Sequence, residues 1–298
     1  MSDGRYENAL SSYSGPFEPV IRKNDLATEL EKLIPAKTKQ IALEYNHTDL
    51  GKFTILKGLF PFADFINADE TVNQVSSVMD KEALKHHKKA SDIVKKSVLA
   101  IGEEDLIGKT EKWIKGKIIQ LLYEGGADEL SFDPIVAAGK NSANPHHKPG
   151  NTKVGKNDVL LIDLGCTVEG VCSDITRMLT PEEGYAKGFD AVYDFVLDML
   201  VEAGEYIKPG MKAGEADKLI REKFHETGLG EFFPHALGHG VGYDIHIYPR
   251  IGSNSDDLIT EGQLLAIEPA VYFPGKFGIR IEDNFLVGAD GCENLTRF

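Results

Sequence analysis

The stretch Val159–Gly165 reads VLLIDLG, an apolar run interrupted by a single aspartate, Asp163. A run of this length and composition is typical of a buried strand, where an unpaired carboxylate is costly. Gly170 then marks a turn, and Val171–Arg177 (VCSDITR) returns as a second strand. The two stretches therefore predict an antiparallel hairpin that carries acidic side chains into the interior.

The register of this hairpin decides whether its two aspartates meet. If the turn is centred between Val168 and Glu169, Asp163 and Asp174 are direct cross-strand neighbours, with Cβ atoms about 5 Å apart. A slip of one residue would send the side chains to opposite faces, so this prediction depends on the position of the turn.

A second hairpin repeats the pattern. Leu264–Glu268 (LLAIE) and Ile279–Glu282 (IRIE) flank a loop centred near Gly275. This spacing predicts that Glu268 and Glu282 also face each other. Like charges directly opposite in a buried sheet are unfavourable unless something compensates them.

Each carboxylate taken alone has an ordinary explanation. Asp163 could cap a turn, Asp174 could pair with Arg177, and Glu282 could pair with Arg280. Four acids in two buried hairpins are harder to explain in this way, whereas two divalent cations would balance all four negative charges. We therefore favour a metal site.

A histidine is expected to complete the ligand set. Residues Pro234–His246 (PHALGHGVGYDIH) hold three of the nine histidines, beside glycines that allow the backbone to approach closely. Oxygen ligands with one imidazole suit Mn²⁺, Co²⁺ or Fe²⁺ better than a structural zinc site with sulfur ligands. We expect two divalent ions, Mn²⁺ or Co²⁺ first, with Fe²⁺ and Zn²⁺ as alternatives.

Charge and cysteine usage narrow the class of protein. The 298 residues include 33 Lys plus Arg and 47 Asp plus Glu, a formal net charge of −14, so neither nucleic acid nor an anionic membrane is an expected partner. Cys166, Cys172 and Cys292 have no C-x-x-C spacing, and the N-terminus lacks the pattern of a signal peptide. We expect a cytoplasmic protein without disulfides.

Periodicity divides the chain into two domains, residues 1–78 and 79–298. Helices are expected over 26–33 and 49–59, from Asp80, over 107–122, from a capping box at Thr180–Glu183 through Ala203, and over 215–227; strands are expected over 40–44 and 132–138. Residues 80–180 and 181–298 share one plan, two helices accompanied by strands, which indicates internal pseudo-symmetry.

Five motifs in this order carry a resemblance to a known family. The sequence resembles the pita-bread metallopeptidases, the group of Xaa-Pro dipeptidase (prolidase), aminopeptidase P and methionine aminopeptidase. The resemblance covers about Asp80 to the C-terminus, and its motifs are Ile162–Gly165, Ser173–Arg177, Gly238–Gly242, Ile267–Pro269 and Arg280–Asp283. It implies an α+β fold, a curved antiparallel sheet backed by helices with internal pseudo-two-fold symmetry. A small α/β N-terminal domain, shorter than is usual in the family, would precede it.

The resemblance also implies a role for each acid. Asp163 binds one metal, Asp174 and Glu282 bridge both metals, and His239 and Glu268 complete the other. A bridging water or hydroxide attacks the scissile carbonyl, and Glu268 shuttles the proton.

Substrate contacts follow from the same comparison. His146 and His246 match histidines that contact the substrate in the family, and Arg250 matches an arginine suited to a substrate carboxylate. An ordinary surface salt bridge is the alternative for Arg250, and packing behind the site is the expected role of His147 and His235.

The resemblance implies a dinuclear Xaa-Pro dipeptidase that acts on short proline-containing peptides and forms a homodimer. An aminopeptidase P that acts on longer peptides is the first alternative, and a non-catalytic peptide-binding module is the second. An amidinohydrolase of the same fold is disfavoured, because its chemistry does not need the complete metal set. One departure from the family concerns substrate preference: Ile247 stands where an acidic residue usually follows the second histidine.

Overall fold

The computed structural model describes residues 1–180 and 188–298, and the chain divides into two compact units, residues 1–73 and 74–298. The domain boundary expected after residue 78 stays a prediction. The capping box expected at Thr180–Glu183 falls on residues 181–187, which lie outside the described residues.

The first unit contains a short parallel βαβ arrangement. Strands β3 and β4 pair in parallel on either side of helix α3 in the sequence. Asp25 and Asp49 begin α2 and α3 by accepting a backbone N–H with their side chains, which confirms both predicted helices. The elements are β1 Ser2–Asp3, α1 Glu7–Ser11, β2 Ile21–Arg22, α2 Leu26–Leu33, β3 Gln40–Leu43, α3 Leu50–Leu59 and β4 Asp64–Asn67; α4 Asp69–Ser76 follows.

The first half of the second unit packs two helices on antiparallel strands. Asp80 accepts the backbone N–H of Ala83 and begins α5, as predicted. The apolar faces of α5 and α6 bury one core against the strands, including Ile93, Ile118 and Ile162. The elements are α5 Lys81–Gly102, α6 Glu111–Glu124, β5 Glu129–Leu130, β6 Ile135–Ala138, β7 Leu160–Leu164, β8 Cys166–Val168, β9 Val171–Cys172 and β10 Ile175–Leu179.

The second half repeats this plan with a core of its own. Helices α7 and α8 cover a second group of strands, and Leu200, Phe224 and Leu265 lie in that core. Its elements are α7 Phe189–Tyr206, α8 Ala213–Glu226, β11 Gly238–Gly240, β12 Ile247–Ile251, β13 Leu264–Ile267, β14 Ala270–Phe273, β15 Phe277–Arg280, β16 Asp283–Val287 and β17 Cys292–Asn294.

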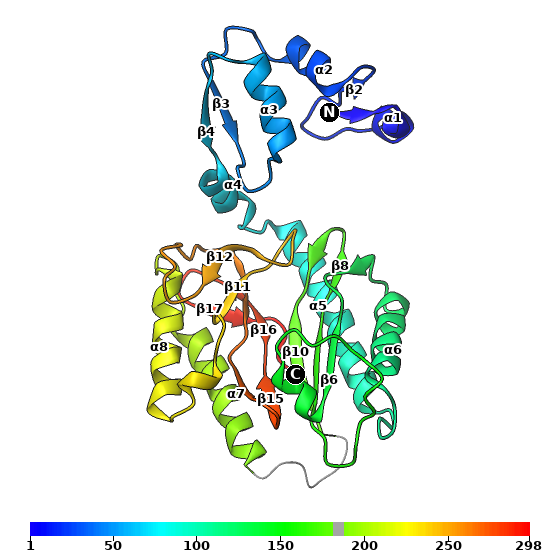
Figure 1. Ribbon diagram of the computed structural model, residues 1–298, viewed down its shortest axis with the longest axis vertical. Helices are drawn as coiled ribbons and strands as arrows, with labels where there is room; N and C mark the ends of the chain where they lie inside the picture. Colours follow the sequence, from blue (N-terminus) through cyan, green and yellow to red (C-terminus); the bar gives the residue numbers. More distant parts are fainter. Residues whose placement is uncertain (181–187) are drawn as a thin grey trace. The chain divides into compact units, whose positions relative to one another are not determined.

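The two halves meet through their strands. Figure 1 shows the helix pair α5 and α6 beside the strands of the first half, and α7 and α8 beside those of the second. The order β10-β7-β6 forms one sheet, and β12-β11-β13-β16-β17 forms another; both are antiparallel. An isolated bridge between Thr176 and Glu282 joins them. The acidic residues of both predicted hairpins therefore lie at the junction.

The register predicted for the first hairpin is wrong. Asp163 pairs with Thr176 instead of Asp174, because the two-residue turn is Glu169-Gly170. Both turn residues have positive φ, 49° and 77°, as a tight hairpin turn of this hand requires. The shift equals two residues, so Asp163 and Asp174 still belong to the same face and become diagonal neighbours.

The register predicted for the second hairpin is confirmed. Strands β14 and β15 pair Ala270 with Arg280, and β13 and β16 continue the same register with Ile267 opposite Asp283. Glu268 and Glu282 therefore face each other, at the point where the two strand pairs are interrupted.

The state of the cysteines and the length and character of the helices are two further features of the described residues. The three cysteines are free. Within residues 1–180 and 188–298, none of the helices combines the length and the apolar character needed to cross a membrane.

The close approach of the two strands at Gly165 gives a stability prediction. A Cβ at this position would lie 2.1 Å from the backbone oxygen of Ser173. Gly165→Ala should therefore lower the free energy of unfolding by about 1–3 kcal/mol in urea titrations. Gly116→Ala is the matched control, because this exposed glycine of α6 has no atom within 4 Å of the new methyl group. It should raise the free energy by up to about 1 kcal/mol. Equal effects of the two changes would contradict the packing argument.

Candidate metal centre

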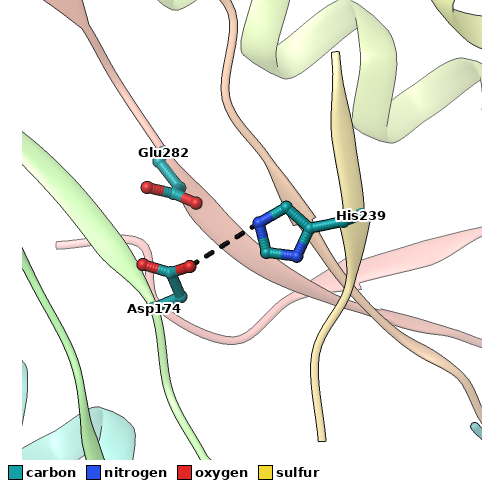
Figure 2. A group of neighbouring side chains, drawn as sticks. All are labelled: Asp174, His239 and Glu282. Carbon is teal, nitrogen blue, oxygen red and sulfur yellow. Dashed lines mark ion pairs between the residues drawn. The ribbon is translucent and has the colours of Figure 1, made fainter. Parts of the chain in front are cut away.

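Three side chains from separate parts of the chain point at one another (Figure 2). Asp174, His239 and Glu282 each offer one ligand atom, and the three atoms lie within 4.8 Å of one another. His239 Nε2 is 3.7 Å from Asp174 Oδ2. All three residues are buried, so their side chains are shielded from water.

The other two predicted ligands border this group. Glu268 Oε1 lies 4.0 Å from His239 Nε2, and the Glu268 side chain is 22% exposed. Asp163 Oδ2 accepts a hydrogen bond from Arg280 Nη2 at 2.5 Å. The structure therefore brings all five predicted residues to one region, with Asp163 held in an ion pair.

His239 is oriented for donation of a lone pair. Its Nδ1 lies 3.0 Å from the backbone oxygen of Gly240, and an N–H at Nδ1 would leave Nε2 as the free acceptor facing Asp174. Burial, followed by the charge of His246, lowers the pKa of His239 to about 4. The ring is therefore neutral at physiological pH, which is the form that binds a metal.

The pKa values of the four carboxylates are all raised above their usual values. Burial raises the pKa of Asp174 well above its usual value, and the charges of Glu282 and Asp163 raise it further. Burial likewise raises the pKa of Glu282, and that of Glu268 to about 8. Burial raises the pKa of Asp163 as well, although Arg280 opposes this shift. The cluster therefore holds more negative charge than its surroundings stabilise.

Among residues 1–180 and 188–298, two buried carboxylate oxygens of the cluster have no hydrogen-bond partner, Asp163 Oδ1 and Asp174 Oδ1. Buried polar atoms are nearly always satisfied, so such atoms call for a ligand. Carboxylate oxygens and one neutral imidazole are the donor set of a divalent transition-metal site. These residues fit the divalent cations implied by the sequence.

Local backbone contacts fix the ligands. The backbone N–H of Asp174 donates to Asn284 Oδ1 at 3.0 Å, and Asn284 Nδ2 donates to the backbone oxygen of Asp174 at 2.7 Å. Next to His239, a Cβ on Gly238 would lie 2.1 Å from the oxygen of Ala266, so only glycine lets β11 pack this closely.

The predicted substrate-contacting residues are all exposed. His246 is exposed, and its ring centroid lies 4.3 Å from that of His239. His146 is exposed in the loop after the 3₁₀ helix Gly139–Ala143. Arg250 is exposed on β12 and pairs in register with His239, so their side chains leave the same face of the sheet. The roles of these residues stay predictions.

His147 and His235 have structural partners. His147 Nε2 lies 2.9 Å from Glu111 Oε2, and His235 Nε2 lies 3.0 Å from the Tyr272 hydroxyl. These contacts agree with the packing role expected for both.

Comparison with known proteins decides the family. The model of metallopeptidase family M24 matches residues 85–289, well over half of the chain. The chain belongs to metallopeptidase family M24. The predicted resemblance is thus confirmed, and so is the α+β pita-bread fold.

Three relatives of this M24 chain are named for one of two activities, dipeptidase or aminopeptidase. The Xaa-Pro dipeptidase of Pyrococcus furiosus is 36% identical over 234 residues, which cover 78% of this chain and 67% of the relative. The crystal structure of the prolidase from Pyrococcus horikoshii covers 99% of this chain and 84% of its own, with a TM-score of 0.91 and 30% identity. The X-Pro aminopeptidase structure from Thermotoga maritima covers 100% and 84%, with a TM-score of 0.87 and 33% identity.

Sequence reasoning gave no role to Thr176 and considered Arg280 only as a partner of Glu282. Thr176 Oγ1 donates to Glu282 Oε2 at 2.7 Å, and Arg280 Nη1 donates to the Tyr272 hydroxyl at 2.7 Å. Thr176 follows Asp174 by two residues, and Arg280 precedes Glu282 by two. The period of a strand places such pairs on one face, so this signal was present in the sequence.

The alternative roles considered for the single acids, a turn cap and two ion pairs, are wrong. Asp163 lies inside β7 and pairs with Arg280, so it caps no turn. Arg177 takes Asp283 as its ion-pair partner at 2.6 Å, instead of Asp174. Arg280 takes Asp163 as its ion-pair partner, instead of Glu282.

Removal of one carboxylate charge gives a metal-binding prediction. Asp174→Asn should lower the metal content of the purified protein and abolish peptidase activity, because an amide supplies no charge to a cluster of cations. Elemental analysis after dialysis against Mn²⁺ or Co²⁺ measures the first effect. Asp244→Asn is the control, since Asp244 is an exposed carboxylate outside the cluster. Full metal loading of Asp174→Asn would contradict the assignment.

The raised pKa of Glu268 predicts how stability depends on pH in the metal-free protein. The folded state keeps the proton up to about pH 8, whereas the unfolded chain releases it near 4.5. The stabilisation from this proton is present below pH 4.5 and is lost as the pH rises to about 8. Urea unfolding in EDTA should therefore show a steeper decline for the wild type than for Glu268→Gln over this window. Parallel curves would refute the shift.

Proposed function

We propose that this M24 chain is a metal-dependent Xaa-Pro dipeptidase that hydrolyses the bond before proline. The observation that carries the proposal is the convergence of Asp174, His239 and Glu282 on one point, beside two unpartnered carboxylate oxygens. Two relatives named Xaa-Pro dipeptidase, at 36% and 32% identity, support the substrate class.

We assign the metal ligands as the sequence predicts them. Asp163, Asp174, His239, Glu268 and Glu282 would hold two divalent cations, Mn²⁺ or Co²⁺ first, with Fe²⁺ and Zn²⁺ as alternatives. Bound cations of this kind polarise a carbonyl group and acidify water, which is the chemistry that peptide hydrolysis needs.

Glu268 is the residue we propose to accept and return a proton. Its side chain is 22% exposed, against 11% for Asp163 and 7% for Asp174, so among these acids it has the best access to substrate and water. Burial raises its pKa to about 8, which brings its proton affinity close to neutral pH.

His146 and His246 are the residues we propose to steady the carbonyl oxygen of the scissile bond as negative charge develops on it. Both are exposed, and the His246 ring lies close to that of the buried His239, at an angle of 57° to it. An N–H group aimed at that oxygen is worth most in the transition state, where the charge is greatest.

Arg250 would bind the free carboxylate of a C-terminal proline. A guanidinium binds a carboxylate through two parallel hydrogen bonds, which favours dipeptides. A longer peptide has to place extra residues at this position instead. The second candidate is therefore an aminopeptidase P, and the similarity to the X-Pro aminopeptidase structure from Thermotoga maritima favours it.

The cytoplasmic location and the homodimer expected from the sequence stay predictions. Size-exclusion chromatography with light scattering would test the homodimer.

A direct test compares a Xaa-Pro dipeptide with a Xaa-Pro-Xaa tripeptide, using protein stripped by a chelator and reloaded with Mn²⁺ or Co²⁺. We expect no turnover without metal and faster turnover of the dipeptide after reloading. Faster cleavage of the tripeptide would identify an aminopeptidase P. Absence of turnover on both substrates with full metal content would favour the non-catalytic module.

Arg250→Ala tests the carboxylate contact. The change should remove about 1.5–3 kcal/mol of transition-state stabilisation on a dipeptide, the usual scale for a charged hydrogen bond, and little on a tripeptide. The measurement is the ratio of kcat/KM between mutant and wild type on each substrate. Equal losses on both substrates would show that Arg250 acts on the structure rather than on the carboxylate.

A further inference from the structure

A loop beside the metal centre is held by a fully buried carboxylate. Glu111 is the first residue of α6, and its side chain is 0% exposed. Its Oε1 accepts hydrogen bonds from the Ala138 N–H at 2.9 Å and from Asn141 Nδ2 at 2.8 Å. Its Oε2 lies 2.9 Å from His147 Nε2 and accepts the Gly150 N–H at 2.9 Å. Glu111 therefore ties the end of β6 to both ends of the loop 141–150.

Only a carboxylate can satisfy all four of these donors. Each ionised oxygen accepts two hydrogen bonds, whereas glutamine would turn an N–H₂ group toward two of the donors. Burial acts to raise the pKa of Glu111, but the hydrogen bonds, led by that of Ala138, outweigh burial and lower it. The side chain is therefore ionised at neutral pH and keeps its acceptor character.

The same loop is held from the opposite side by the metal centre. Arg280 Nη1 donates to the oxygen of Pro145 at 3.4 Å, while Arg280 Nη2 pairs with Asp163. Pro145 is thus anchored to the centre, and His147 is anchored to Glu111. His146 lies between these two anchored residues, and its own side chain is exposed.

We propose that Glu111, acting through His147, positions the imidazole of His146 for the substrate. The inference rests on the proposed function, in which His146 steadies the scissile carbonyl. The four partners of Glu111 belong to β6 or to the loop, so Glu111 is a positioning residue and not a catalytic one. A displacement of about 1 Å is enough to cost about a hundredfold in rate, so loss of one anchor should be visible in kinetics.

The first test removes the anchor that is partly exposed. His147→Ala should lower kcat/KM on a Xaa-Pro dipeptide by about tenfold to a hundredfold. His147→Gln should recover most of this loss, because its amide N–H can donate to the same oxygen of Glu111. Elemental analysis should give wild-type metal content for both variants.

A double-mutant cycle separates positioning from a general structural effect. In a His146→Ala background, His147→Ala should cause little further loss, since the imidazole that it positions is already absent. Glu111→Gln should show the same coupling where it folds. Ile118→Val is the control: it removes one buried methyl group from the same helix, and its small effect should be independent of His146.

Additive losses in the double variant, or metal loss that parallels the loss of activity, would overturn the positioning role. If the wild type cleaves no Xaa-Pro peptide, the proposed function fails, and amide hydrogen exchange then tests the anchor by itself. Faster exchange over residues 139–150 in His147→Ala would support the anchor, and unchanged exchange would overturn it.

Discussion

The central constraint on this M24 chain is the gathering of four carboxylates in one region, three of them buried: Asp163, Asp174 and Glu282. Asp163 and Asp174 come from the first half of the catalytic unit, and Glu268 and Glu282 come from the second. Their burial and their mutual repulsion both favour protonation, so bound cations or protons stabilise the contact between the two halves. The bridge between Thr176 and Glu282 joins the two sheets at this point. The site is therefore complete only where the two halves meet.

Arg280 places one positive charge at the centre of this acidic cluster. It is 3% exposed, and it donates to Asp163, Tyr272 and Thr176 from the centre of the site. One buried cation offsets one of the four negative charges, and the remaining charges raise the pKa values of the acids. Arg280 also reaches Pro145, so the same guanidinium couples the charge balance of the centre to the loop that carries His146.

The sequence predicts which strand faces carry the acids better than it predicts the strand pairing. The second hairpin is correct in register, whereas the first is shifted because Glu169 adopts a positive φ. Tight turns of this type usually carry Asn-Gly or Asp-Gly, so Glu-Gly is a weak signal. The shift of two residues preserved the faces of the strands, so the convergence of Asp163 with Asp174 survived the error. Glu111 could not be predicted, because it meets its loop only through contacts 27 to 39 residues away in the chain.

Both halves hold a neighbouring segment through a buried acid in the same way. In the first half, Glu111 of α6 accepts the N–H of Ala138 at the end of β6. In the second half, Asp217 of α8 is likewise 0% exposed, and it accepts the N–H of Leu237 at 2.9 Å, just before β11. Arg221 pairs with Asp217 and donates to the oxygens of Phe233 and His235, so it fixes the segment that leads into His239. Each half thus holds a neighbouring segment through a buried acid on its second helix. This equivalence supports the internal pseudo-symmetry expected from the sequence at the level of single hydrogen bonds.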